Sequence, residues 1–176
     1  MSLTRAPRLE TDRLILRSPE TSDAEAYIAF LTDRPRADGF GAYDNRGDAW
    51  RWFALNVGHW HIHGYGYFTL ELKDTGAVAG ICGIWNPEGW PEPEIGWALF
   101  AGHEGKGLAV EAALRARRWA YEDLGLPALT SNIVPGNARS AALAERLGAV
   151  LERTYDNVYM GQEELWRHPA PKDGLP

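Results

Sequence analysis

The sequence predicts a single α/β (α+β) domain in which a mixed, mostly antiparallel sheet of about seven strands is flanked by about four helices. Two observations predict this class. The length of 176 residues, with 45% apolar and 24% charged residues, suits one globular core. Segments with strand and helix patterns then follow one another in the order βααβββαβαββ. The domain is expected to span residues 9–167, with tails at 1–8 and 168–176.

The first half of the chain is expected to form one strand, two helices and two further strands. Ser22 or Asp23 can cap the first helix, and a polar, glycine-containing loop at 34–47 separates it from the second. The strands are expected at 11–17, 65–72 and 77–85, and the helices at 22–31 and 48–62.

The second half contains the clearest helix. It begins at the turn Gly105-Lys106-Gly107 and runs to the stop signal Leu124-Gly125-Leu126-Pro127. Alanines along this helix form a small-residue stripe, which would let it lie close to a sheet. A shorter helix at 138–147 is capped by Asn137. Strands are expected at 94–100, 129–134, 149–155 and 158–166.

The composition argues against several classes of protein. The formal net charge of −6 is unlike that of a general nucleic-acid binder, which is usually basic. No apolar run approaches the roughly 18–20 residues of a membrane span, and the N-terminus lacks the apolar stretch of a signal peptide. The single cysteine, Cys82, cannot form an internal disulfide, and its apolar neighbours favour a buried side chain. These observations favour a cytoplasmic protein.

The turn at residues 105–107 has the properties of a phosphate-binding site. Backbone N–H groups at the start of a helix bind anions, and glycines at 105 and 107 let a diphosphate approach without meeting a Cβ atom. The dinucleotide fingerprint is incomplete, because Val110 stands where its third glycine is required. No loop typical of nucleoside triphosphatases occurs. The alternative is that the glycines only make a tight strand–helix turn.

Several segments, in the right order, resemble motifs of the GNAT superfamily of N-acetyltransferases. Segments 94–97 (EIGW) and 103–112 (HEGKGLAVEA) look like its acetyl-CoA motif, and 134–140 (VPGNARS) with 144–149 (AERLGA) resemble its next motif. The opening segment 9–17 (LETDRLILR) is similar to the RimJ/RimL-like branch, which modifies protein N-termini and other amines. The resemblance extends over nearly the whole chain and implies acetyl-CoA as the cosubstrate.

The resemblance also implies how acetyl-CoA would bind. Family members splay two neighbouring parallel strands apart at a bulge, and the pantetheine arm inserts between them. Here those strands would be 94–100 and 129–134, and a backbone N–H near Leu99 would stabilise the developing charge of the thioester carbonyl. The arm is expected to lie against Trp97, Ala98 and Leu99, and the pyrophosphate against the backbone amides of Glu104, Gly105, Lys106, Gly107, Leu108 and Ala109.

Two positions depart from the family pattern. Glu104 stands where Gln or Arg is usual, and an acidic side chain there is expected to turn outward, because facing a diphosphate would be repulsive. Ala149 replaces a common Phe, which is a milder change. Since the turn would bind phosphate through backbone amides, the change at 104 need not abolish binding.

Three polar residues are candidates for catalysis or cofactor contact. Glu94 stands where the family often places a carboxylate, so it is the candidate general base, acting through a water; alternatively it is a solvated strand-end residue. Ser140 is a candidate proton donor to the departing thiolate and a cofactor contact, or an ordinary residue of the first helical turn. Asn137 is expected to bond to the pantetheine or to cap its helix.

The acceptor site is expected between the two N-terminal helices with their loop, the 86–93 loop and the last hairpin. Several aromatic residues lie in or near these segments, and some of them belong to the core: Tyr43, Trp50, Trp52, Trp85 and Trp90. His59, His61 and His63 suggest a metal site, but a helix disperses alternate residues around its axis, so no metal is expected.

The sequence therefore predicts an acetyl-CoA-dependent N-acetyltransferase that acts on an amine in a ternary complex, without metal or covalent intermediate. A non-catalytic acyl-CoA-binding or sensor domain on the same fold is one alternative, and an interaction domain that binds no nucleotide is another. The acceptor is left open among protein N-termini, ribosomal proteins, polyamines, aminoglycosides and amino acids. An exposed final hairpin could pair two chains into a homodimer, as in many relatives.

Overall fold

The computed structural model describes residues 6–171 of the chain. Within that range it contains eight strands and five α-helices. The strands are β1 (Leu9–Glu10), β2 (Leu14–Arg17), β3 (Tyr67–Leu72), β4 (Val78–Trp85), β5 (Glu94–Leu99), β6 (Thr130–Ile133), β7 (Val150–Asn157) and β8 (Gly161–Arg167). The helices are α1 (Ala24–Leu31), α2 (Arg34–Ala37), α3 (Arg46–His63), α4 (Leu108–Glu122) and α5 (Ala138–Arg146), and a short 3₁₀ helix (Thr21–Asp23) precedes α1.

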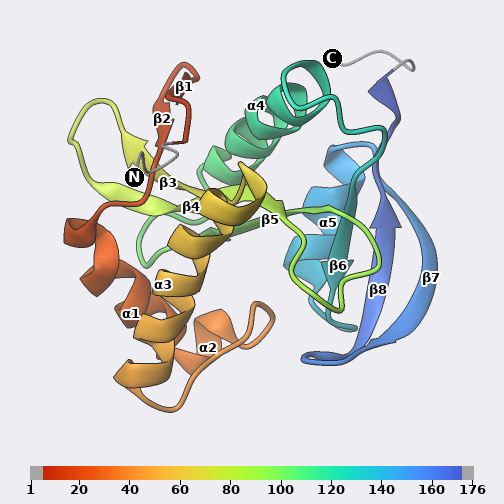
Figure 1. The fold of residues 1–176 in the computed structure, drawn as a ribbon, viewed down its shortest axis with the longest axis horizontal. Helices are drawn as coiled ribbons and strands as arrows, with labels where there is room; N and C mark the ends of the chain where they lie inside the picture. The colour runs from red at the N-terminus through yellow and green to blue at the C-terminus, as the bar shows by residue number, and fades with distance from the viewer. Residues whose placement is uncertain (1–5, 172–176) are drawn as a thin grey trace.

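All eight strands belong to one sheet, in the order β1-β2-β3-β4-β5-β6-β8-β7. Every neighbouring pair is antiparallel except β5 and β6, which are parallel. Figure 1 shows β3, β4 and β5 crossing the view, whereas β6, β8 and β7 run in a clearly different direction. One face of the sheet packs against α1 and α3, and the other packs against α4. The sheet therefore divides into two parts that meet between β5 and β6.

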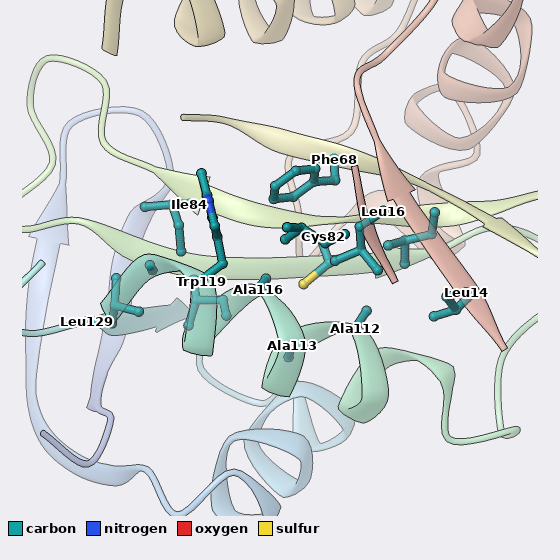
Figure 2. Close-up of a cluster of buried hydrophobic side chains, with 14 of the residues drawn as sticks. Leu14, Leu16, Phe68, Cys82, Ile84, Ala112, Ala113, Ala116, Trp119 and Leu129 are labelled. Carbon is teal, nitrogen blue, oxygen red and sulfur yellow. The ribbon is translucent and has the colours of Figure 1, made fainter. Parts of the chain in front are cut away.

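The core beneath α4 depends on the alanine stripe that the sequence predicted. Ala112, Ala113 and Ala116 are fully buried, and their small side chains let the helix lie close to the strands. Figure 2 shows these alanines facing larger side chains of the sheet, such as Phe68. Cys82 is part of this core, and burial raises the pKa of its thiol. As predicted, its side chain is buried, and it packs as a small hydrophobe.

The predicted fold class is confirmed, with one more strand and one more helix than expected. The expected first strand at 11–17 begins only at Leu14, because a tight turn follows β1. Thr11 N–H donates to the Leu14 carbonyl oxygen at 3.0 Å, and Thr11 Oγ1 accepts the Leu14 N–H at 2.9 Å. The chain therefore folds back, and β1 pairs with β2 with Leu9 opposite Leu16.

The additional helix, α2, lies within the predicted loop at 34–47. Pro35 occupies its first turn, where a fixed φ favours helix and no N–H is needed. The following helix, α3, begins two residues earlier than predicted, because the side chain of Asn45 accepts a backbone N–H and caps it. Asp23 precedes α1, as expected, but its carboxylate pairs with Arg17 instead of capping the helix.

The fold continues past the predicted boundary at residue 167. His168 is buried, and the carbonyl oxygen of Pro169 accepts the hydroxyl of Tyr121 at 2.9 Å. The expectation of a tail from 168 is therefore wrong for these two residues. Residues 1–5 and 172–176 of the predicted tails lie outside the described residues. Between residues 6 and 171, no helix has the length and apolar character needed to cross a membrane.

Candidate active site

β5 and β6 pair as parallel strands at one position, Glu94 opposite Thr130. Continued parallel pairing would join the N–H of Asn132 to the carbonyl oxygen of Ile95. Instead, Asn132 N–H donates to Glu94 Oε2 at 3.0 Å, and Ser131 Oγ donates to the Ile95 carbonyl oxygen at 2.6 Å. Two side chains thus replace the backbone partners, and the strands separate beyond this point.

The backbone of β5 directs two residues toward the gap. The β4–β5 register is regular, so the expected bulge is absent from this pair. Phe100 N–H donates to β4. Because the bonding direction alternates along an antiparallel strand, Ala98 also bonds to β4, whereas Trp97 and Leu99 direct their N–H groups toward β6. Of the three residues expected along the pantetheine arm, Trp97 and Leu99 have their backbone at the gap and Ala98 does not.

A buried polar network supports the point of separation. Arg117, which is 1% exposed, donates to the Leu147 carbonyl oxygen at 2.5 Å and to His168 Nδ1 at 3.3 Å. His168 Nε2 lies 2.9 Å from Ser131 Oγ, and it is the donor because Ser131 gives its own proton to Ile95. Burial, followed by the charge of Arg117, lowers the pKa of His168 to about 3, so the ring is neutral. The network therefore links the strands to α4 and to the end of β8.

The turn before α4 has the backbone expected of an anion-binding site. Gly105 and Gly107 have positive φ angles of 74° and 77°, a conformation that favours glycine. The first backbone hydrogen bond of α4 runs from Glu111 N–H to the Gly107 carbonyl oxygen at 3.2 Å. The N–H groups of Leu108 and Ala109 precede it, at the positive end of the helix dipole.

Glu104 lies between α2 and the backbone of its own turn, so the expected outward direction of its side chain stays a prediction. Its carboxylate forms an ion pair with Arg36 and accepts the Gly102 N–H at 3.0 Å. Two more cations lie at the turn: Arg13 Nη1 donates to the Lys106 carbonyl oxygen at 2.8 Å, and Lys106 Nζ donates to the Gly102 carbonyl oxygen at 2.7 Å. Arg36 also pairs with Asp33 at 3.0 Å, so its charge offsets that of Glu104 only in part, and no local sequence signal indicated this partner.

A pocket of about 480 Å³ opens beside Glu94. Its lining residues come from the segments in which the sequence placed the acceptor site: the N-terminal helices with their loop, the β4–β5 loop and the last hairpin. Residues of β5, β6 and α5 also line it. Of the five aromatic residues named from the sequence, four line this pocket: Tyr43, Trp52, Trp85 and Trp90. The fifth, Trp50, is exposed on α3 and does not.

Glu94 is buried in the pocket wall with 7% of its surface exposed, which excludes the solvated strand-end alternative. Oε2 accepts both the backbone N–H and the Nδ2 group of Asn132, at 3.0 and 2.7 Å. Burial, and next the negative charge of Glu163, raise the pKa of Glu94 to about 7, against the effect of these hydrogen bonds. A carboxyl with this pKa can exchange a proton near neutral pH.

Glu163 is a second buried carboxylate of the same pocket, and the sequence analysis missed it. Its Oε2 accepts the Tyr155 hydroxyl at 3.0 Å and Asn157 Nδ2 at 2.9 Å. Burial raises the pKa of Glu163, and these hydrogen bonds oppose the change. Asn157 Oδ1 also accepts backbone N–H groups of the hairpin, so the turn lies at 158–160 and not at 156–157 as expected. The sequence did contain one signal for the burial of Glu163: it lies two positions from the buried Leu165, so both side chains point to the same face of β8.

Asn137 and Ser140 both line the pocket at the start of α5. Asn137 Oδ1 accepts the Ser140 N–H at 3.3 Å, so the capping role expected for Asn137 is confirmed. Its Nδ2 group is not needed for the cap. The two side chains therefore lie where a ligand in the gap between β5 and β6 could reach them.

Of the three histidines of α3, His59 supports the pocket wall, and the His63 ring packs beside it with centroids 4.4 Å apart. His59 Nδ1 donates to the Tyr65 carbonyl oxygen at 2.7 Å, and Nε2 accepts the Asn86 N–H at 3.2 Å. Its ring stacks on Trp85 with centroids 4.3 Å apart. In the part of the chain that the structure describes, no three His, Cys, Asp or Glu side chains are arranged to hold a metal ion.

The site has three features expected of an acyl-CoA-dependent N-acetyltransferase. These are two parallel strands that separate, a buried carboxylate where they separate, and an anion-binding turn before a helix. Comparison with known families agrees: residues 13–150 match the family model described as an acetyltransferase (GNAT) domain. The chain therefore belongs to the GNAT acetyltransferase family.

Known relatives cover most of the chain. YkkB of Bacillus subtilis is 29% identical over 151 residues, which are 84% of this chain and 87% of that protein. The [ribosomal protein uS5]-alanine N-acetyltransferase of Escherichia coli is 26% identical over 171 residues, covering 91% and 86%. A crystal structure of an acetyltransferase from Agrobacterium tumefaciens is 39% identical, with a TM-score of 0.85 over 93% of this chain and 94% of that one. The resemblance to RimJ/RimL-like acetyltransferases and the predicted acyltransferase activity are thus confirmed.

Proposed function

We propose that this acetyltransferase transfers the acetyl group of acetyl-CoA directly to a primary amine in a ternary complex, with Glu94 as the general base. The observation that carries the proposal is the place of Glu94, a buried carboxylate whose pKa is raised to about 7 where β5 and β6 separate. A carboxylate of this kind is suited to take a proton from an amine at neutral pH.

The reaction proceeds in one displacement. An ammonium acceptor gives a proton to Glu94, directly or through a water, and the neutral amine attacks the carbonyl carbon of the thioester. The N–C bond forms and the C–S bond breaks, and the products are an amide, CoA as its thiol and one proton released to solvent. We assign the backbone N–H at Leu99 or Trp97 to the developing charge on the carbonyl oxygen. Ser140 protonates the departing thiolate and regains a proton from the attacking nitrogen, which loses its second proton as the amide forms.

Acetyl-CoA is proposed to bind with its pantetheine arm between β5 and β6, along Trp97 and Leu99. The Asn137 amide group bonds to the arm, and the pyrophosphate rests on the amides of residues 104–109. The ion pair between Glu104 and Arg36 supports this arrangement, because it offsets part of the negative charge of an acidic side chain at the turn.

Thermal unfolding with and without excess acetyl-CoA tests this function, with NAD and ATP as controls. At about 100 times the dissociation constant, a ligand adds about 2.7 kcal/mol, which raises the midpoint by about 5–10 °C. Amines are then screened for release of the CoA thiol. A shift with acetyl-CoA but no CoA release with any amine would favour the sensor, and the absence of a shift would contradict the site.

Replacing Arg36 by alanine is expected to weaken acetyl-CoA binding about tenfold, because it removes the cation that offsets part of the Glu104 charge at the turn. In the Glu104→Gln background, the same change should cost less than about twofold. Calorimetric titration of wild type, both single variants and the double variant measures this coupling. Arg34→Ala removes an arginine of the same helix that pairs with Asp44, so it is the matched control. Equal losses in the two backgrounds would show that Arg36 acts independently of Glu104.

Three expectations about the whole molecule stay predictions: cytoplasmic location, no general nucleic-acid binding, and pairing of two copies. For the last, β7 is the outer strand of the sheet, and Val150 and Leu151 are exposed on it.

A further inference from the structure

The pocket beside Glu94 has a wall of aromatic rings that contact one another. The ring centroid of Trp52 lies 5.2 Å from Phe40, 5.7 Å from Tyr67 and 5.6 Å from Trp85. Trp85 in turn stacks on His59. These rings come from α3, the loop before it, β3 and β4, so the core fixes the shape of the wall.

A second aromatic pair connects two loops at the pocket. Trp90 of the β4–β5 loop and Tyr159 of the last hairpin stack with centroids 5.7 Å apart, and both line the pocket. Close to these rings, Gly96 leaves the space that the Tyr67 hydroxyl occupies, because a Cβ at 96 would lie 2.2 Å from that oxygen. The side chains that form this part of the pocket wall, where the acceptor amine is expected, are therefore mostly flat and apolar.

The ionisable groups of this pocket are all acidic or tyrosine. Among the described residues that line it, Glu88, Glu94 and Glu163 are acidic, and none is Lys, Arg or His. Glu94 and Glu163 are 7% and 4% exposed, and the charge of Glu163 raises the pKa of Glu94, so the two carboxylates interact. Buried carboxylates beside aromatic faces attract a cation and repel an anion.

Asn132 adds a hydrogen-bond acceptor that no described residue uses. Its Nδ2 group donates to Glu94, whereas its Oδ1 atom is buried and has no partner in the described part of the chain. A buried carbonyl oxygen without a donor costs free energy, which a bound N–H group recovers. An ammonium group has three N–H donors, and three side chains that line the pocket, those of Asn132, Glu94 and Glu163, carry acceptor oxygens.

We propose that the acceptor is a compact primary amine with an aromatic or apolar body and no carboxylate, bound as its ammonium ion by Glu94, Glu163 and Asn132 against the aromatic wall. This inference rests on the proposed acetyl transfer and names the substrate class for it.

The other acceptor classes match the pocket less well. A free amino acid brings a carboxylate, and the lining residues include no cation to neutralise it. An aminoglycoside or a peptide N-terminus brings hydroxyl or amide groups that the aromatic wall leaves without partners. The volume of about 480 Å³ must also hold the thioester end, because Asn137 and Ser140 line the same pocket.

The test compares four acceptors by the kcat/KM of CoA release at saturating acetyl-CoA: 2-phenylethylamine, phenylalanine, spermidine and a hexapeptide with N-terminal alanine. We expect 2-phenylethylamine to exceed phenylalanine by at least about 100-fold, because the two differ only in the carboxylate. It should exceed spermidine and the peptide by at least about tenfold.

A pair of variants tests the charge. Glu163→Gln is expected to lower kcat/KM for 2-phenylethylamine about 10–100-fold, mainly through KM, because it removes one of the groups that bind the ammonium ion. Glu145→Gln makes the same change on the exposed side of α5, outside the pocket, and should have no effect. Thermal unfolding of both variants shows whether each is folded.

The outcomes separate this inference from the function on which it rests. A preference for the peptide, for phenylalanine or for spermidine over 2-phenylethylamine would overturn the substrate class and leave acetyl transfer intact. An unchanged KM in a folded Glu163→Gln variant would also overturn it. If acetyl-CoA binds but neither these four acceptors nor any amine of the screen releases CoA, the proposed function fails together with the inference.

Discussion

Replacing Glu94 by glutamine is expected to lower kcat/KM about 10²–10⁴-fold at pH 7, because the general base is lost. Glutamine has nearly the same shape, and its Oε1 atom can still accept the two Asn132 groups that now bind Glu94 Oε2. The separation of β5 and β6 should therefore persist. Acetyl-CoA binding, measured by thermal shift, is expected to be unchanged, so the loss should appear in turnover.

The pH profile identifies the cause of that loss. The wild-type kcat/KM is expected to rise with pH through an apparent pKa near 7 and then level off, because only ionised Glu94 accepts a proton. Since Glu94 and Glu163 interact, this apparent pKa belongs to the pair. Glu94→Gln should lose the rise. Glu92→Gln removes a nearby carboxylate that pairs with Arg167 and does not line the pocket, and it should keep the wild-type profile.

The Glu94→Gln substitution is also expected to stabilise the protein at pH 8. In the folded protein the pKa of Glu94 is raised from 4.5 to about 7, so the folded state holds a proton that the unfolded chain has lost. The wild-type free energy of unfolding therefore falls as pH rises through this window, by at most about 3 kcal/mol. Glutamine does not ionise, so its advantage in thermal unfolding should be large at pH 8 and small at pH 5. An equal advantage at both pH values would mean that ionisation of Glu94 is not the cause.

The parts of the fold that the sequence predicted well are those specified by local signals. The glycines at 105 and 107 and the stop signal at 124–127 delimit α4, and the alanine stripe between them indicates which face packs on the sheet. Each of these signals acts within a few residues of the chain. The first strand was predicted less well, because the turn at Thr11 that separates β1 from β2 is held in part by a side chain and is not visible in an apolar pattern.

The candidate site was predicted only in part, because it depends on contacts between distant segments. Glu94 was identified as a candidate base, yet its raised pKa requires burial and the charge of Glu163, 69 positions later in the numbering. Likewise, Arg36 pairs with Glu104 across 68 positions, so the sequence showed the acidic residue without its partner. The tertiary neighbours of such a residue decide whether it has a functional or an ordinary structural role, and no local sequence pattern contains them.

Acetyl-CoA binding is expected to depend strongly on the backbone of Gly107. Gly107→Val should weaken binding at least about 100-fold, because valine resists the positive φ of 77° and adds a Cβ atom where the diphosphate approaches the amides. In the protein without ligand, an added Cβ at 107 would approach only Arg13 Nη2, at 3.6 Å. The variant is therefore expected to fold, with loss of stability from backbone strain and not from a steric clash.

Gly125→Val is the matched control for that strain. Gly125 has a φ of 67° at the other end of α4, and an added Cβ there would meet nothing within 4 Å. Both variants should lower the midpoint of unfolding without ligand to a similar extent, since each forces valine into the left-handed region at about 1–2 kcal/mol. Only Gly125→Val should retain the rise of about 5–10 °C with excess acetyl-CoA. If Gly107→Val also retained this rise, the diphosphate would lie away from the turn. Gly105 and Gly107 would then serve only to connect β5 to α4.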